Sequence, residues 1–364
     1  MCQIQVSKRL FDQERAEGFS QKLLDTVNAG SLSLMISIGH RTGLFDTMSN
    51  LPPSTSPEIA DAAGLNERYV REWLGAMAIS GVVEYDTSTR CYSLPAEHAA
   101  YLTRAAAENN MAVFTQYIAV MGQVEDDILE CFRNGGGVPY SSFPRFHEVM
   151  AEDSGQSVLS SLFDHILPLI PRIQDRLESG IDVLDLGCGR GKALIAMAER
   201  FPQSRFVGYD LSEEAIAYAD AQAQMRNLKN IRFEVRDLSD YSQTADIHSY
   251  DFVTTFDAVH DQAKPMELLK GIRRTLRPGG TYMMQDISSS SHIENNMNHP
   301  LGTLLYTIST MHCMTVSLAQ GGEGLGTVWG RELAQTMLRE AGFGQITIHQ
   351  LDHDVQNEYY VMPV

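Results

Sequence analysis

The stretch Val183-Leu-Asp-Leu-Gly-Cys-Gly-Arg-Gly-Lys192 decides the fold, because three alternating glycines stand between an apolar run and a helical pattern. The run 181–186 is typical of a buried parallel strand, and residues 193–201 have the spacing of the helix that follows it. Glycine lets the backbone turn tightly and approach a ligand closely, since no Cβ stands in the way. The stretch therefore predicts a strand, a nucleotide-binding turn and a helix.

Acidic residues near the ends of successive predicted strands narrow this interpretation. A glycine-rich turn alone also occurs in dehydrogenases, in flavoproteins and in loops without ligands. Here Asp185 stands two residues before the first glycine, and the spacing differs from the G-x-G-x-x-G of dinucleotide folds. The next strand ends in Asp210, from which a carboxylate can accept hydrogen bonds from a ribose diol. The strand after it leads to Asp237 and Leu238, which can meet the amino group and the face of an adenine.

With these residues the chain resembles the class I S-adenosylmethionine-dependent methyltransferases over roughly residues 180–364. The resemblance continues through the strand 251–257 and the Arg-Pro-Gly-Gly turn 277–280. It ends in an expected antiparallel pair at 345–350 and 358–362. It implies an α/β domain with a seven-stranded Rossmann-like sheet. A doubly wound domain without a cofactor is the alternative.

The resemblance also implies S-adenosyl-L-methionine as the cofactor, with S-adenosyl-L-homocysteine as the product. The acidic residue after the fourth strand is expected beside the amino-acid part of the cofactor, with an aromatic neighbour packing next to it. The predicted cofactor-binding residues are Asp185, Gly187, Cys188, Gly189, Gly191, Asp210, Leu211, Asp237, Leu238, Phe256 and Asp257.

The catalytic candidate is His260. In the winged-helix O-methyltransferases that this chain resembles, a His-Asp pair in the corresponding stretch supplies the general base, and His260-Asp261 matches it. An imidazole with a pKa near about 6.5 can take a proton from a hydroxyl or a thiol. The following Gln262 to Pro265 departs from the tryptophan and acidic helix start of that family. A capping or packing role for His260 is therefore the alternative.

Residues 56–94 have the pattern of a helix-turn-helix followed by a two-stranded wing, which is the α-rich winged-helix part of the predicted fold. Such a module often binds DNA, and the rival hypothesis is a regulator that senses S-adenosylmethionine and binds DNA without catalysis. In the would-be recognition helix, however, two glutamates offset two arginines. DNA binding is therefore disfavoured.

The order of the two parts resembles small-molecule O-methyltransferases of plants and bacteria, whose amino-terminal winged-helix domain dimerises and walls the substrate pocket. It is also similar to a less studied group of winged-helix methyltransferases known from mycobacteria. The resemblance implies a dimerisation domain at 1–104 and a helical linker with a lid at 105–175. The cofactor domain follows at 176–364, with an insertion at about 287–329.

Two segments are expected to meet the methyl acceptor. The glycine-rich joint 135–144 is interpreted as a lid or as a plain linker, and the long insertion as the acceptor pocket or as ordinary core. The predicted substrate-binding residues are Tyr140, Tyr306, Met311, His312 and Trp329.

Composition limits the partners. The 364 residues, 43% of them apolar, fit a two-domain soluble enzyme. A net charge of −18 disfavours nucleic acid, which needs a cationic surface. Five scattered cysteines, together with residues 1–10 that lack a signal-peptide core, favour a cytoplasmic protein. No apolar stretch has membrane length, so no membrane partner is expected.

We therefore expect a homodimeric enzyme that methylates oxygen, sulfur or nitrogen of a small molecule. No metal is expected, because His299 and His312 lack partners at ligand spacing.

Overall fold

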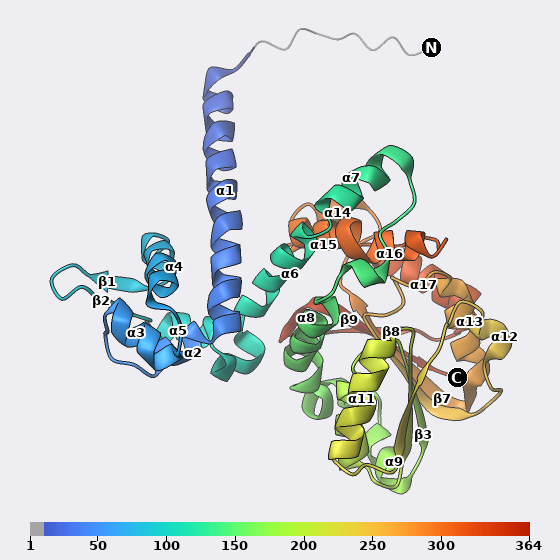
Figure 1. The fold of residues 1–364 in the computed structure, drawn as a ribbon. Helices are drawn as coiled ribbons and strands as arrows, with labels where there is room; N and C mark the ends of the chain where they lie inside the picture. The colour runs from blue at the N-terminus through green and yellow to red at the C-terminus, as the bar shows by residue number, and fades with distance from the viewer. Residues whose placement is uncertain (1–10) are drawn as a thin grey trace. The chain divides into compact units, whose positions relative to one another are not determined.

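The computed structural model describes residues 11–364, and the chain divides into two compact units (Figure 1). The first contains residues up to Ala106 together with Asn110–Ile118, and the second contains Ala107–Asn109 and Ala119–Val364. Cys2 and the expected lack of a signal-peptide core in residues 1–10 lie outside the described residues. No helix of residues 11–364 combines the length and the apolar character needed to cross a membrane.

The first unit has the helix-turn-helix and wing expected from its sequence. Its elements are α1 (Gln13–Thr42), α2 (Leu44–Ser49), α3 (Ser56–Ala63), α4 (Glu67–Ile79), β1 (Glu84–Asp86), β2 (Cys91–Ser93) and α5 (Ala96–Leu102). The wing strands pair antiparallel, and Figure 1 shows them as a projecting hairpin. Trp73 lies in the core of this unit. Its ring packs edge-on against Phe45 with the ring centroids 5.3 Å apart, and its Nε1 donates a hydrogen bond to the carbonyl oxygen of Met35 at 2.8 Å.

The second unit is built on a seven-stranded sheet with the order β5-β4-β3-β6-β7-β9-β8. The first five strands along the sheet are parallel, and β9 runs antiparallel to both of its neighbours. This confirms the predicted α/β class and the closing antiparallel pair. The strands are β3 (Asp182–Leu186), β4 (Arg205–Asp210), β5 (Ile231–Val235), β6 (Tyr250–Phe256), β7 (Leu276–Ile287), β8 (Thr347–Leu351) and β9 (Asp354–Pro363).

Helices cover both faces of the sheet because the buried strands are apolar on both sides. One face packs side chains such as Leu184 and Val253 against α12 (Tyr241–Thr244), α13 (Pro265–Thr275) and α17 (Gly330–Glu340). The other packs Val183 and Phe252 against α9 (Ile173–Ser179), α10 (Lys192–Arg200) and α11 (Glu213–Met225). The sheet is thus a rigid frame whose strand ends can position a site.

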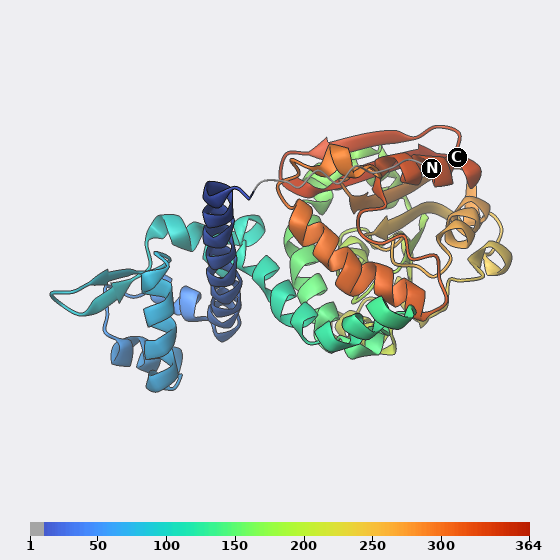
Figure 2. The same ribbon diagram turned by 90° about the horizontal axis from the view of Figure 1, so that it is seen from above.

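Further helices precede the sheet and fill the insertion after β7. Figure 2 shows α15 (Gly302–Ile308), η6 (Ser309–Cys313) and α16 (Met314–Ala319) as one continuous rod. Before the sheet lie η1 (Arg104–Asn109), α6 (Ala112–Gly122), α7 (Glu125–Asn134), η2 (Tyr140–Ser142), α8 (Phe146–Ser154), η3 (Gly155–Leu159), η4 (Leu162–Ile166) and η5 (Leu167–Leu169). The insertion contains α14 (Ile293–Asn296), α15 (Gly302–Ile308), η6 (Ser309–Cys313) and α16 (Met314–Ala319).

Candidate active site

The candidate site lies at one edge of the parallel part of the sheet. Neighbouring parallel strands end at the same edge, so the order β5-β4-β3-β6 places the carboxyl ends of these four strands side by side. The chain continues from β3 into the glycine turn, from β4 into Leu211, and from β6 into Asp257. Ligands of open α/β sheets bind at such an edge, where the strand order reverses.

The glycine turn after β3 needs all three of its glycines. Gly187, Gly189 and Gly191 have φ values of +71°, +52° and +67°, a region that other residues rarely adopt. A Cβ on Gly187 would lie 2.5 Å from the Cβ of Ala258, whereas a Cβ on Gly189 would meet no atom within 4 Å. The turn is therefore closed on its protein side and open at Gly189. Such a cradle fits a nucleoside ligand that approaches the main chain closely.

Asp210 ties the end of β4 to this turn. Its Oδ2 accepts a hydrogen bond from the Gly189 amide at 2.8 Å, and its Oδ1 accepts one from the Ser212 amide at 2.8 Å. A carboxylate has about four acceptor positions, so the group can still accept from a ligand. Beyond β5, Asp237 is exposed and Leu238 is buried. These positions suit the ribose and adenine contacts expected of them, and those roles stay predictions.

Asp185 lies inside the sheet, where it is 3% exposed. Its Oδ1 accepts a hydrogen bond from the Thr254 hydroxyl at 2.8 Å. Burial raises the pKa of Asp185 to about 7; the Thr254 hydrogen bond works against this shift, and the charge of Asp210 adds to it. Nearby, burial raises the pKa of the Cys188 thiol well above its usual range. Cys188 is therefore a packing residue of the turn with no reactive thiolate.

The carboxylate that holds His260 is Asp286, at the end of β7, and not the adjacent Asp261. His260 Nδ1 lies 2.8 Å from Asp286 Oδ1, and both residues are buried. The same oxygen accepts hydrogen bonds from Trp329 Nε1 and from the Ile287 amide, each at 2.9 Å. Three donors thus fix the carboxylate that orients the imidazole.

The surroundings of His260 favour its protonated form. Burial alone lowers the pKa of the imidazole, but the charge of Asp286, assisted by Cys313, more than offsets this effect. The pKa of His260 therefore stands well above its ordinary value. For Asp261, burial raises the pKa to about 6, against the effect of His260.

An aromatic cluster lies near these carboxylates. The His312 ring stacks on Phe146 with centroids 3.3 Å apart, and the edges of Phe143 and Tyr140 meet it at 4.7 and 5.0 Å. Tyr140 also stacks on His147 at 4.8 Å. The pKa of Tyr140 is raised well above its usual value by burial, and further by the charges of Asp261 and Asp210. Tyr140 therefore lies close enough to Asp261 and Asp210 to sense their charges.

The other predicted substrate residues are placed differently. Trp329 contacts Asp286, as described above. Met311 is half-buried in η6, one residue before His312. Tyr306 is 39% exposed on α15, and its hydroxyl accepts from Asn296 Nδ2 at 3.3 Å.

Sequence reasoning missed three residues of this region: Asp286, His147 and Cys313. Of these three, only Asp286 could have been recognised from the sequence as a site residue, because it is an acid at the end of a predicted strand. Asp257, His260 and Asp286 also place one donor atom each within 4.8 Å of one another. Two of these residues, Asp257 and His260, lie three residues apart in the loop after β6, whereas Asp286 lies at the end of β7.

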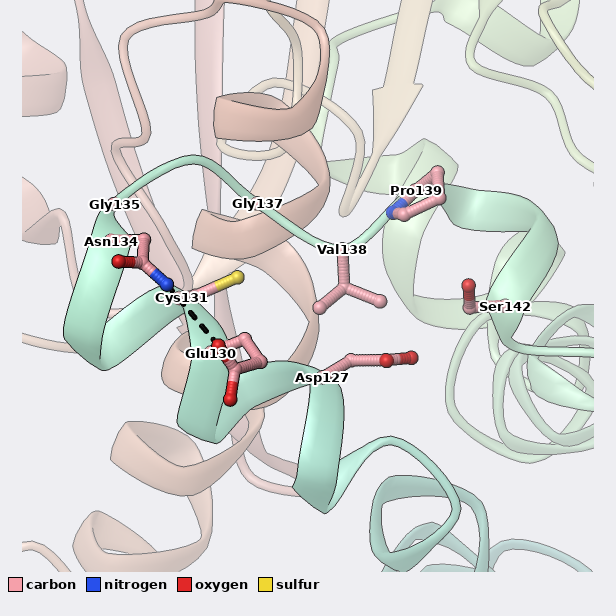
Figure 3. A pocket seen from close by; sticks show the side chains of 9 residues that line it. All are labelled: Asp127, Glu130, Cys131, Asn134, Gly135, Gly137, Val138, Pro139 and Ser142. Carbon is pink, nitrogen blue, oxygen red and sulfur yellow. Dashed lines mark hydrogen bonds between the residues drawn. The ribbon is translucent and has the colours of Figure 1, made fainter.

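A cavity of about 350 Å³ lies elsewhere in the second unit and is shown in Figure 3. Its walls are α7 and the segment after it: Asp127, Glu130, Cys131, Asn134, Gly135, Gly137, Val138, Pro139 and Ser142. That segment is fixed to α16, because the Val138 amide donates to Thr315 Oγ1 at 2.8 Å and a Cβ on Gly137 would lie 2.0 Å from the Thr315 carbonyl oxygen. No predicted site residue lines this cavity, so it is not the candidate active site.

Comparison with known families agrees with this architecture. Residues 177–342 match the family described as methyltransferase domain, and residues 30–104 match the Rv2258c-like winged HTH domain. The chain belongs to the class I methyltransferases, with an N-terminal winged-helix domain. The family predicted from the sequence is thus confirmed.

Relatives of this methyltransferase cover only part of it. Trans-aconitate 2-methyltransferase of Deinococcus radiodurans is 33% identical over 115 residues, which are 32% of this chain and 41% of that protein. The 2-heptyl-1-hydroxyquinolin-4(1H)-one methyltransferase of Mycobacteroides abscessus is 34% identical over 123 residues, 31% of this chain and 51% of that protein. The chain therefore spans about half the length of the curated relatives it matches.

Solved structures extend the likeness to the whole fold. Human N-acetylserotonin methyltransferase in complex with SAM has a TM-score of 0.65 at 18% identity, covering 98% of this chain and 99% of that one. At this identity the likeness shows a shared fold. S-adenosylmethionine is the cofactor of the methyltransferase family that residues 177–342 match, as the sequence indicated.

Proposed function

We propose that this methyltransferase transfers a methyl group from S-adenosylmethionine to oxygen, sulfur or nitrogen of a small-molecule acceptor, with His260 as the general base. The observation that carries the proposal is the buried pair of His260 and Asp286 beside a glycine turn that is open at Gly189. The relatives named for trans-aconitate and for a hydroxyquinolone support an acceptor of small size.

Each part of the site has a task in such a reaction. S-adenosylmethionine, when bound, supplies an electrophilic methyl group on a sulfonium. Displacement at that carbon needs an aligned acceptor and little water. The glycine turn and Asp210 bind and orient, and Tyr140 with the His312 cluster excludes water. His260 takes the proton of the acceptor, while Asp286 holds the ring through Nδ1 and balances the charge that forms.

The protonation of His260 sets the expected pH dependence. Because its pKa is raised, the imidazole keeps its proton to higher pH than an ordinary histidine does, and only the neutral ring can accept a proton. We therefore expect the rate to rise with pH for a hydroxyl acceptor.

The experiment has a binding step and a turnover step. Calorimetric titration with S-adenosylhomocysteine compares wild type with Asp210→Ala, and we expect binding to wild type and a clear loss of affinity in the variant. A screen of small phenols, thiols and imidazoles then compares wild type with His260→Ala. We expect turnover to fall about 10²- to 10⁴-fold with product affinity preserved. Folded wild type that does not bind S-adenosylhomocysteine would refute methyl transfer, whereas undiminished turnover by His260→Ala would refute only the base.

The first unit is proposed to form a homodimer through α1. Exposed apolar side chains recur along this helix at Phe19, Leu23, Val27, Leu34 and Ile38, with 43 to 66% of each exposed. Water disfavours a stripe of this kind, and a second copy of the same helix would cover it.

The remaining expectations are part of the same proposal: the division at residues 104 and 175, the lid role of segment 135–144 and the cytoplasmic location. DNA binding without catalysis finds no support in α4, because Arg68 pairs with Glu72 and Arg71 pairs with Glu67. These two pairs leave α4 with no net positive charge to offer to phosphates.

A further inference from the structure

The loop that carries His260 is held by the insertion after β7. This His260 loop, residues 257–264, joins β6 to α13 and belongs to neither a helix nor a strand, so its carbonyl groups need partners from elsewhere. The His260 carbonyl accepts a hydrogen bond from the Gly326 amide at 3.2 Å, and the Ala263 carbonyl accepts one from the Glu323 amide at 3.0 Å. Both donors belong to the glycine-rich part of the insertion.

The Ser317 hydroxyl joins three segments at one point. Ser317 lies on α16 and is fully buried. Its Oγ donates a hydrogen bond to the Gln262 carbonyl at 2.9 Å and accepts one from the Gly324 amide at 3.1 Å. One hydroxyl can donate and accept at the same time, so this side chain ties α16 both to the His260 loop and to the glycine loop 321–326.

The packing around this hydroxyl is close. A Cβ on Gly322 would lie 2.5 Å from Ala263 Cα and 2.6 Å from Ser317 Oγ, so the glycine loop rests directly on the His260 loop. Protein interiors packed at such density transmit small displacements. A change at Ser317 should therefore move the Gln262 peptide, which lies two residues from His260.

We propose that Ser317 is a positioning residue, which acts through the Gln262 carbonyl to keep the His260 imidazole in its bond with Asp286. His260 Nδ1 lies 2.8 Å from Asp286 Oδ1, which leaves Nε2 to take a proton. A hydrogen bond weakens steeply when its geometry departs from such values. The role of His260 as a base rests on the proposed function, whereas the orientation of its ring by Ser317 does not.

The pKa of His260 reports this orientation. Burial lowers the pKa of the ring, and the charge of Asp286 more than offsets that effect. The other titratable groups that face the ring from the neighbouring segments are Asp257, Asp261, His312 and Cys313. If the bond to Asp286 lengthens, its contribution shrinks and the pKa of His260 falls. A loss of global stability alone would leave this pKa unchanged.

A second buried serine of the same unit is the matched control. Ser204 is fully buried and lies just before β4, at the end of the sheet opposite to the site. Its Oγ donates to the Leu177 carbonyl at 2.6 Å and accepts from the Ile181 amide at 3.0 Å, which is the same pair of hydrogen bonds that Ser317 makes. Ser317→Ala and Ser204→Ala should therefore lose similar stability in urea unfolding.

The experiment is an NMR titration of the full-length, isotope-labelled chain. The imidazole signal of His260 is assigned by its loss in His260→Ala, and its pKa is measured in wild type, Ser317→Ala and Ser204→Ala. We expect the pKa to fall by at least about half a pH unit in Ser317→Ala and to keep its wild-type value in Ser204→Ala. With an acceptor found in the screen, turnover by Ser317→Ala should fall at least about tenfold, at unchanged affinity for S-adenosylhomocysteine.

An unchanged pKa of His260 in folded Ser317→Ala overturns the proposal. An equal fall in Ser204→Ala also overturns it, because the cause would then be a general loosening of the unit. If Ser317→Ala does not fold, Gly322→Ala displaces the same loop without removing a hydrogen-bonding group, and an unchanged pKa there overturns the proposal as well. If wild type methylates no acceptor, the proposed function fails, while the titration still decides whether Ser317 orients the ring.

Discussion

Alanine substitutions at Gly187 and Gly189 should impair different properties, although the two glycines are two residues apart in one turn. The first should mainly lower stability, and the second should mainly weaken cofactor binding. In Gly187→Ala the new Cβ would lie 2.5 Å from the Cβ of Ala258, and the backbone has a φ of +71°. A left-handed conformation costs about 1–2 kcal/mol and overpacking about 1–3 kcal/mol, so we expect a loss of about 2–5 kcal/mol in the free energy of unfolding.

Gly189→Ala has only the cost of the left-handed backbone and no overpacking, because its Cβ would meet no protein atom within 4 Å. We expect a loss of stability of about 1–2 kcal/mol. The methyl group would instead occupy the open side of the turn, where we place the cofactor. S-adenosylhomocysteine should therefore bind at least about tenfold more weakly, which corresponds to about 1.4 kcal/mol.

Urea unfolding and calorimetric titration with S-adenosylhomocysteine separate the two effects. Gly344→Ala is the matched control, since that exposed glycine of the same unit also has no atom within 4 Å of the added Cβ and lies outside the site. Wild-type affinity in Gly189→Ala would refute the placement of the cofactor against this turn. Wild-type stability in Gly187→Ala would refute the contact with Ala258.

Two further predictions concern the sheet and the first unit. Asp185 is buried with a pKa of about 7 against an ordinary value of 3.8, so the folded state holds its proton when the unfolded state has lost it, and stability should fall as the pH rises through this window. This difference in pKa corresponds to at most about 4 kcal/mol of stability. Asp185→Asn should flatten the pH dependence of the free energy of unfolding, measured with urea between about pH 4 and about pH 7. An equal slope in wild type and variant would contradict this prediction. Leu23→Asp in α1, where Leu23 is 51% exposed, should convert a dimer to a monomer in light scattering with little change in stability, and a monomeric wild type would contradict the dimer proposal.

The parallel sheet could be predicted from the sequence because its signals are local. Each buried strand is a short apolar run followed closely by a glycine or an acid, so the predicted strand 181–186 agrees with β3 to within one residue. The helix-turn-helix was predicted equally well, since Gly64 lies in the left-handed region between α3 and α4.

The site was predicted less completely because its contacts are not local. His260 was recognised from its own stretch, but the Asp286 that holds it is 26 residues away and the Trp329 that holds Asp286 is 43 residues further on. Such partners are fixed by strand order and by the path of the insertion, neither of which leaves a spacing pattern. The adjacent Asp261 was for this reason the natural partner to expect.

The three hydrogen bonds accepted by Asp286 Oδ1 have a consequence for how new specificities arise. They come from the loop after β6, from β7 itself and from Trp329 at the end of the insertion. The insertion, which we propose lines the acceptor pocket, is thereby anchored to the group that holds the imidazole. Exchange of the insertion between related enzymes should succeed only when the incoming segment brings an indole, or another N–H donor, to the same oxygen. Substrate range and reactivity would then change together, because one segment affects both the acceptor pocket and the orientation of His260. An insertion that keeps this N–H donor could remove the old acceptor while leaving His260 oriented for a new one.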